Sequence, residues 1–161
     1  MKKIISLCAA LVLILSFGIS AMAETNENIL EISYVVYDKE GDVKEFGIIP
    51  NLNARYSWSG ITLENGESVS FKKKDGTPFK ISSGTRCEFK LNLSRKCKIH
   101  SEFLRSDASG AAKETVRTWD TTALTASLEY TTDVQNGSYF YWRTENASSD
   151  AVTIKKASFT F

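Results

Sequence analysis

Few residues in the sequence have the types and spacing that catalysis needs. His100 is the only histidine among 161 residues, so it cannot complete a two-histidine metal site, and neither HExxH nor CxxC occurs. A nucleophilic pair of Cys97 with His100 is disfavoured because residues three apart in a strand point to opposite faces. No GxSxG elbow or glycine-rich phosphate loop is present. We therefore predict no catalytic residue, no cofactor and no metal site.

Two acidic features leave alternatives open. Paired carboxylates for glycoside cleavage follow no spacing rule in sequence, so Glu64, Glu67, Asp120 and Glu129 keep a small hydrolase as an alternative. The segment "YDKEGD" at 37–42 combines acidic residues with glycine, as calcium loops do, but it lacks the ligand spacing of an EF-hand. A plain hairpin turn is the favoured interpretation of that segment.

The segment "GSYFYWRTEN" at 137–146 holds four consecutive aromatic residues. Because strand side chains alternate between faces, Phe140 and Trp142 share one face, which we expect to be core. Tyr139 and Tyr141 share the other face with Arg143, about 7 Å apart along the strand. Such a row can stack sugar rings or line a peptide groove, or it can be ordinary cross-strand pairing.

Trp119 is the second aromatic candidate for ligand contact. In an extended strand its same-face neighbours are polar, and it lies near "RSDASGAAKE" at 105–114, which reads as a long exposed loop. We predict a ligand-binding surface formed by Tyr139, Tyr141, Arg143 and Trp119.

The charge of the chain is unevenly distributed. Residues 72–105 carry ten basic and three acidic side chains, between two segments of net negative charge. They favour a positive patch attractive to anionic polymers or lipid headgroups, although lysines on the solvent face of two hairpins would give the same composition. The predicted basic patch consists of Lys72, Lys73, Lys74, Lys80, Arg95, Lys96 and Lys98.

The first residues read as a targeting signal. Lys2 and Lys3 precede an apolar run from Ile4 to Ile19, and Ala21-Met22-Ala23 supplies a small-x-small cleavage site. We predict a cleaved signal peptide at 1–23, a single domain at 24–161, and a secreted, extracellular protein of bacterial origin; an uncleaved N-terminal anchor is the alternative.

Cleavage would leave Cys87 and Cys97, and an oxidising compartment would permit a disulfide between them. If residues 87–93 are extended and Ser94-Arg95-Lys96 makes a turn, a simple hairpin places Cys87 opposite a residue near Glu102. The sequence therefore leaves both a bridge and two separate thiols open.

The remaining chain has the pattern of an all-β domain. Period-two runs bounded by turn residues recur along it, with hairpin signals at Asn65-Gly66 and Asp75-Gly76. We predict eight to ten strands, no helix, and an antiparallel β-sandwich of jelly-roll-like design, with a closed barrel as the alternative.

These observations predict a secreted, non-catalytic binding protein that recognises an extracellular glycan or cell-wall polymer through exposed aromatic residues. The alternative is a protein that acts on anionic surfaces or membranes through the basic patch at 72–105. We expect no nucleic-acid partner, and the sequence indicates no oligomeric state.

Overall fold

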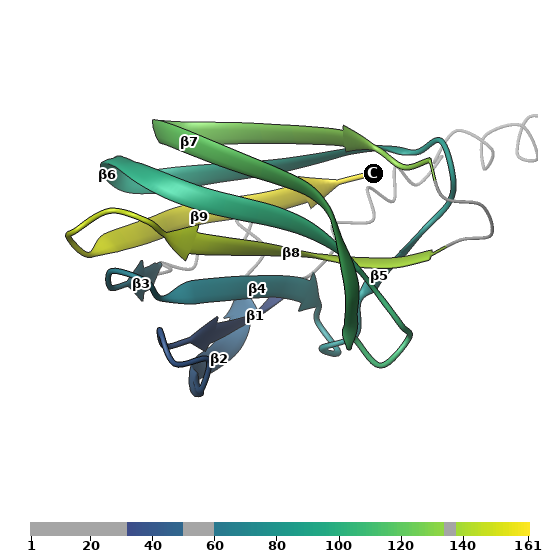
Figure 1. Cartoon of the computed structure of the whole chain (residues 1–161), viewed down its shortest axis with the longest axis horizontal. Helices are drawn as coiled ribbons and strands as arrows, with labels where there is room; N and C mark the ends of the chain where they lie inside the picture. Colours follow the sequence, from purple (N-terminus) through teal and green to yellow (C-terminus); the bar gives the residue numbers. More distant parts are fainter. Residues whose placement is uncertain (1–31, 50–59, 134–137) are drawn as a thin grey trace, which may run out of the picture.

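The computed structural model describes residues 32–49, 60–133 and 138–161 (Figure 1). Within these residues the chain forms nine strands, every pairing is antiparallel, and no helix occurs. The predicted all-β class and the predicted number of strands are confirmed. No helix that could cross a membrane is found in this part of the chain. The predicted signal peptide at 1–23 lies outside the described residues.

The strands join into one hydrogen-bonded sheet. They are β1 (Ile32–Tyr37), β2 (Val43–Ile49), β3 (Ile61–Leu63), β4 (Ser68–Lys73), β5 (Phe79–Ile81), β6 (Arg86–Ser106), β7 (Ala112–Thr131), β8 (Ser138–Asn146) and β9 (Val152–Thr160). Their order is β2-β1-β4-β8-β6-β9-β3; β5 also pairs with β8, and β7 pairs with β6. Because β4 and β5 both pair with β8, they form one interrupted strand around the turn at 74–78.

The sheet is doubled over at the middle of its two longest strands, as Figure 1 shows for β6 and β7. The first part of β6, to Leu93, pairs with β9, and the part from Ile99 onward pairs with β8. The β6–β7 pairing is interrupted between Asn92 and Cys97, where the register shifts. The result is a sandwich of two layers. Layer A contains β2, β1, β4, β8 and the second half of β6, and layer B contains β3, β9 and the first half of β6.

The expected turn at Ser94–Lys96 is wrong, because β6 continues through it. Odd-numbered residues stay buried on both sides of the bend, including Leu93 and Cys97, so the alternation of faces is preserved. The expected long loop at 105–114 is also wrong. It is a tight turn in which Asp107 Oδ1 accepts backbone hydrogen bonds from Ser109 (2.9 Å) and Ala111 (3.1 Å).

The two cysteines are buried, unbridged thiols. Cys87 and Cys97 lie ten residues apart on β6, opposite Tyr130 and Ala123 of β7. An extended strand rises about 3.3 Å per residue, whereas a disulfide requires Cα atoms about 5.5 Å apart. No bridge therefore links them within this strand. Burial raises the pKa of the Cys87 thiol to about 11, which keeps it protonated and unreactive at neutral pH.

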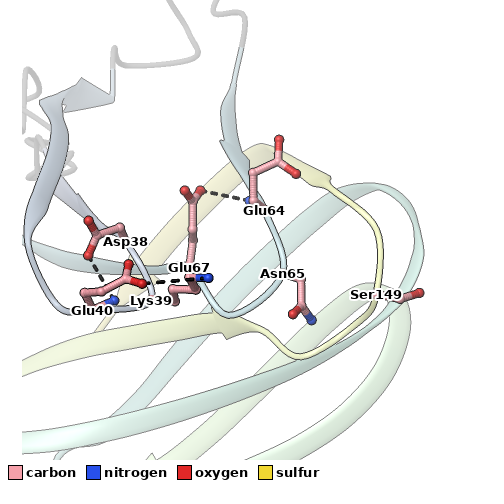
Figure 2. Close-up of a pocket in the computed structure, with 7 residues that line it drawn as sticks. All are labelled: Asp38, Lys39, Glu40, Glu64, Asn65, Glu67 and Ser149. Carbon is pink, nitrogen blue, oxygen red and sulfur yellow. Dashed lines mark hydrogen bonds and ion pairs between the residues drawn. The ribbon is translucent and has the colours of Figure 1, made fainter.

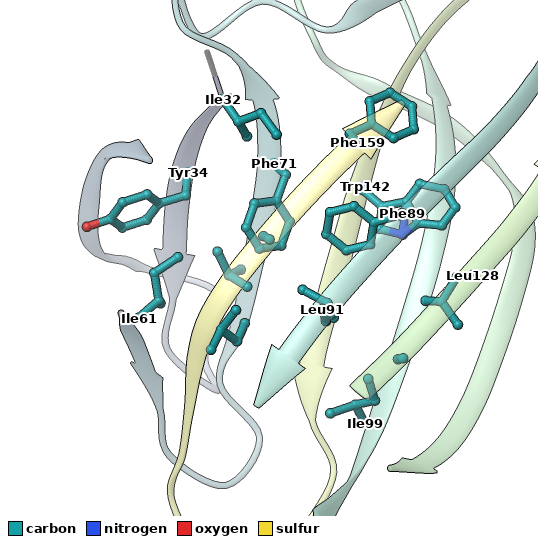
Figure 3. Packing of buried hydrophobic residues seen from close by; sticks show 14 of the residues in the cluster. Ile32, Tyr34, Ile61, Phe71, Phe89, Leu91, Ile99, Leu128, Trp142 and Phe159 are labelled. Carbon is teal, nitrogen blue, oxygen red and sulfur yellow. The ribbon is translucent and has the colours of Figure 1, made fainter. Parts of the chain in front are cut away.

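The core lies between the two layers and is rich in aromatic rings (Figure 3). Phe89 of layer B packs against Phe71 and Trp142 of layer A, with ring centroids 5.0 Å apart in both pairs. Phe79 and Phe159 meet at 4.7 Å. Fully burying a large apolar side chain stabilises a fold by about 1.5–3 kcal/mol, so these rings account for much of what holds the layers together.

A buried asparagine fixes one end of the sandwich. The side-chain amide of Asn146, with no exposed surface, donates to the carbonyl oxygens of Leu63 (3.0 Å) and Asp150 (2.9 Å). Its Oδ1 accepts a hydrogen bond from the Ser148 N–H at 3.0 Å. One side chain therefore holds the β8–β9 connection together and ties it to β3.

Candidate functional site

The outward side chains of layer A form a polar surface, called here the outer face. Directly paired residues of an antiparallel sheet share a face, so the registers arrange these side chains in rows across the strands. One row is Tyr37, Ser68, Glu145, His100 and Asp120, and the next is Val35, Ser70, Arg143, Glu102 and Thr118. Beyond them lie Lys72 with Tyr141 and Leu104, and finally Lys80 with Tyr139 and Ser106.

The structure brings Tyr139, Tyr141 and Arg143 onto this face, as the alternation of the strand predicts, but the two tyrosines differ in exposure. Tyr139 is half-buried and reachable from solvent, whereas Tyr141 is only 8% exposed. The Lys72 ammonium lies 4.9 Å from the centre of the Tyr141 ring. Burial is the main cause of the raised pKa of Tyr141. Tyr141 is therefore the floor of the surface, and Tyr139 is the ring a ligand can reach.

Two side-chain pairs span β6 and its neighbours on the outer face. Arg143 of β8 forms an ion pair with Glu102 of β6 at 2.6 Å. Further along, His100 Nδ1 lies 3.0 Å from Asp120 Oδ1. Planar charged groups fixed in this way present donors and acceptors in set directions, an arrangement suited to hydroxyl-rich ligands.

Trp119 does not join the predicted surface. It pairs with Ser101, whose side chain is buried, and its ring stacks on the core residue Trp142 at 5.2 Å with planes 24° apart. The Arg117 guanidinium lies 5.9 Å from the Trp119 ring. Trp119 is thus half-buried on the core side of β7, and the sheet separates it from Tyr139 and Arg143.

The predicted basic patch is divided among separate places. Lys72 and Lys80 lie on the outer face beside Tyr139 and Tyr141. Lys73 ends β4 and Lys74 lies in the turn that follows. Arg95, Lys96 and Lys98 lie at or near the bend of β6, and Arg95 pairs with Asp150 at 2.7 Å. Lys98 is six residues from Leu104 along β6, about 20 Å, so the seven cations do not make one patch.

Tyr37 is an outer-face residue that the sequence analysis did not select. It is half-buried and lies opposite Ser68 on β4. Its position on the opposite face of β1 from Ile32, Tyr34 and Val36 was a usable signal. What the sequence could not reveal is that β1 and β8 belong to the same layer.

A separate hollow of about 390 Å³ lies at the end of the sandwich where three connections meet (Figure 2). Its walls come from the β1–β2, β3–β4 and β8–β9 connections and comprise Asp38, Lys39, Glu40, Glu64, Asn65, Glu67 and Ser149. The side-chain amide of Asn65 crosses to the carbonyl oxygen of Ser148 at 2.6 Å. This contact links the β3–β4 connection to the β8–β9 connection.

Two carboxylates of this hollow, those of Glu67 and Asp38, are already engaged in local structure. Glu67 receives hydrogen bonds from Lys44 Nζ (2.6 Å) and from the Glu64 backbone N–H (2.9 Å). Burial raises the pKa of Glu67, but these hydrogen bonds outweigh burial and lower it overall. Asp38 accepts the backbone N–H groups of Glu40 and Asp42, as expected of a hairpin turn. Across 32–49, 60–133 and 138–161, no three histidine, cysteine or acidic side chains are grouped to hold a metal.

No family model and no curated protein matches the chain. Among solved structures, it is similar to one described as "BiXyn10A CBM1 APO", with 11% identity and a TM-score of 0.35, over 66% of this chain and 92% of that one. It is also similar to the CBM22-1–GH10 modules of Clostridium thermocellum endo-1,4-beta-D-xylanase 10B complexed with xylohexaose, with 13% identity and a TM-score of 0.38. That match covers 81% of this chain and 24% of the other. Scores this low identify neither a ligand nor a site for this protein.

Proposed function

We propose that the protein is a non-catalytic binding module that holds a glycan or other cell-surface material on its outer face. The observation that carries this proposal is the joint presence, in adjoining rows of one sheet, of an accessible tyrosine ring, cations and a fixed ion pair. Tyr139 offers a flat apolar ring with a polar tip. Arg143 and Glu102 offer directed hydrogen-bonding groups on the same face, beyond Tyr141 and about 13 Å along the strand from Tyr139.

A platform of this kind suits a sugar better than a purely apolar or purely ionic ligand. A pyranose ring has an apolar face that can lie on an aromatic ring and a rim of hydroxyls that need hydrogen-bond partners. Binding sites commonly combine apolar area with a few placed polar groups that fix orientation. The outer face has both kinds of group within two neighbouring strands, β6 and β8.

Co-sedimentation of the purified protein with insoluble cell walls, plant polysaccharides and anionic vesicles, at low and high salt, tests the proposal. Ring stacking and hydrogen bonding persist in salt, whereas binding by surface charge weakens steeply. We expect salt-resistant binding to a polysaccharide, a loss of about tenfold in Tyr139→Ala, and partial retention in Tyr139→Phe.

A control comes from the bend of β7, far along the strand from the proposed site. Leu124, between the partners of Asn92 and Cys97, is 51% exposed, so Leu124→Ala removes an accessible apolar side chain there. We expect it to bind like the unaltered protein. Normal polysaccharide binding by Tyr139→Ala would contradict the platform, and salt-sensitive binding to vesicles alone would favour action on anionic surfaces.

A further inference from the structure

The side chain of Lys72 is enclosed in a way that the other cations of the outer face are not. It is half-buried, with its ammonium above the Tyr141 ring. The tip of the β6–β7 hairpin lies against it, since a Cβ atom added to Gly110 would be 2.9 Å from Lys72 Nζ and 3.7 Å from Pro78 Cδ. Lys72 thus lies between an aromatic floor and a hairpin tip.

Lys72 lacks the carboxylate partner that neighbouring cations have. Arg143 pairs with Glu102, and Arg105 with Glu114, each at 2.6 Å. In the described part of the chain no acidic group forms an ion pair with Lys72, and burial lowers the pKa of its ammonium. A partly desolvated cation is costly to leave without a counter-charge. The Tyr141 ring compensates in part through a cation–π contact.

We infer that Lys72 receives the carboxylate of an acidic sugar and that the outer face therefore selects uronic-acid glycans; the inference rests on the proposed function. Tyr139 lies two residues from Tyr141 on β8, about 7 Å along the same face, and pairs with Lys80 of β5. Lys80 and Lys72 both lie on the β4–β5 side of β8, so a sugar stacked on Tyr139 has two cations along one edge. Its carboxylate supplies the counter-charge that the described residues do not.

A sugar acid accounts for this arrangement better than an anionic membrane does. Adsorption to a lipid surface adds small contributions from many cations that reach one plane. Here Arg95, Lys96 and Lys98 lie toward the bend of β6, away from Lys72 and Lys80. The cations near Tyr139 are few, and the most enclosed of them, Lys72, lies above the Tyr141 ring. Such an arrangement suits a single carboxylate better than a plane of lipid headgroups.

The test compares charged glycans with uncharged forms of the same polymers. Binding of the purified protein to polygalacturonate and alginate is measured by titration calorimetry beside their esterified forms, and beside phosphatidylglycerol vesicles. The variants are Lys72→Gln, which keeps the stem and removes the charge, and Lys72→Arg, which keeps the charge. Lys96→Gln at the bend is the control because it changes the net charge equally. Thermal unfolding of each variant verifies folding.

We expect at least one acidic polymer to bind about tenfold or more tighter than its ester. Lys72→Gln should remove that preference, while Lys72→Arg should keep most of it and Lys96→Gln should keep all of it. An ester bound as tightly as the acid would overturn the inference and leave glycan binding intact. A preference that survives in Lys72→Gln would also overturn it. Binding to vesicles but to no polysaccharide, charged or esterified, would overturn the proposed function together with the inference.

Discussion

The nine residues of β8 alternate between two faces of the strand, and these two faces have different physical roles. Its inward residues Phe140, Trp142, Thr144 and Asn146 are at most 1% exposed and contact other strands of both layers. Its outward residues are half-buried, apart from Tyr141. Because inward side chains are packed on all sides, they determine stability. Outward side chains have a free side and are available for a ligand.

Tyr141 is the exception that refines this comparison. It points outward but is as buried as the core residue Tyr34, because Lys72 covers its ring and the β6–β7 hairpin in turn lies against Lys72. Strand alternation therefore determines the side to which a residue points, and covering elements determine whether a ligand can touch it. An aromatic row counted from the sequence overstates the accessible platform by one ring.

The largest predicted contrast is between Trp142 and Tyr139. Trp142→Ala removes the ring that contacts Phe89, Phe103 and Trp119, and should reduce the free energy of unfolding by about 3–5 kcal/mol. Tyr139→Ala should change it by less than about 0.5 kcal/mol. Urea denaturation followed by fluorescence measures both. Equal losses in the two variants would show that the outer face is also structural.

A second contrast compares neighbours at the end of β8. Asn146→Ala deletes a fully buried amide and leaves the carbonyl oxygens of Leu63 and Asp150 without its hydrogen bonds, at a cost of about 2–3 kcal/mol. Glu145→Ala, on the opposite face, should be within about 0.5 kcal/mol of the unaltered protein. Denaturant titration of both variants tests this, and a neutral Asn146→Ala would refute its role as a tie between β8 and β3.

A smaller effect is expected at Tyr34, which points inward on β1. Its hydroxyl donates to Glu45 at 2.7 Å, and burial, with this hydrogen bond, raises the pKa of Tyr34 from 10.0 to about 12. Tyr34→Phe should cost about 1 kcal/mol at neutral pH.

The advantage of tyrosine over phenylalanine at this position should depend on pH. A raised folded-state pKa means that the stabilisation is complete below pH 10 and is lost as the pH rises through about 12. Denaturant titrations of the unaltered protein and of Tyr34→Phe, from pH 8 to pH 12, should show their free energies of unfolding converging as the pH rises. A constant difference would contradict the raised pKa.

The smallest effect on stability is expected for the outer-face ion pair. Arg143 is 43% exposed, so its pair with Glu102 should contribute less than about 1 kcal/mol. A double-mutant cycle of Arg143→Ala with Glu102→Gln measures this coupling. Glycan binding should fall in Arg143→Ala even though folding is nearly unchanged. A coupling as large as the loss in Trp142→Ala would remove the distinction between the two faces.

Several features of the fold follow directly from the sequence. The inward face of β8 is predicted by period-two alternation, because each residue of a strand turns its side chain to the face opposite its neighbour's. The turn glycines Gly66 and Gly76 have φ of +79° and +77°, as the Asn-Gly and Asp-Gly signals predict.

The candidate site could be predicted only in part. Tyr139, Tyr141 and Arg143 share a face by alternation alone, so their grouping was predictable. The exclusion of Trp119 was not, because alternation relates residues within one strand and does not say which face of another strand meets the core. The single long β6 was missed for a similar reason, since its bend arises where its partner changes from β9 to β8.

The sequence alone is thus enough for the all-β class, for the alternation of faces within a strand and for the core positions of Phe140 and Trp142 on β8. The tertiary structure decided which outward residues meet: Lys72 reaches Tyr141 because β4 pairs with β8 in one register, across 68 intervening residues. Local alternation is a property of successive residues and can be read along the chain. Contact between distant strands depends on the free energy of packing the whole sheet, which no local pattern encodes.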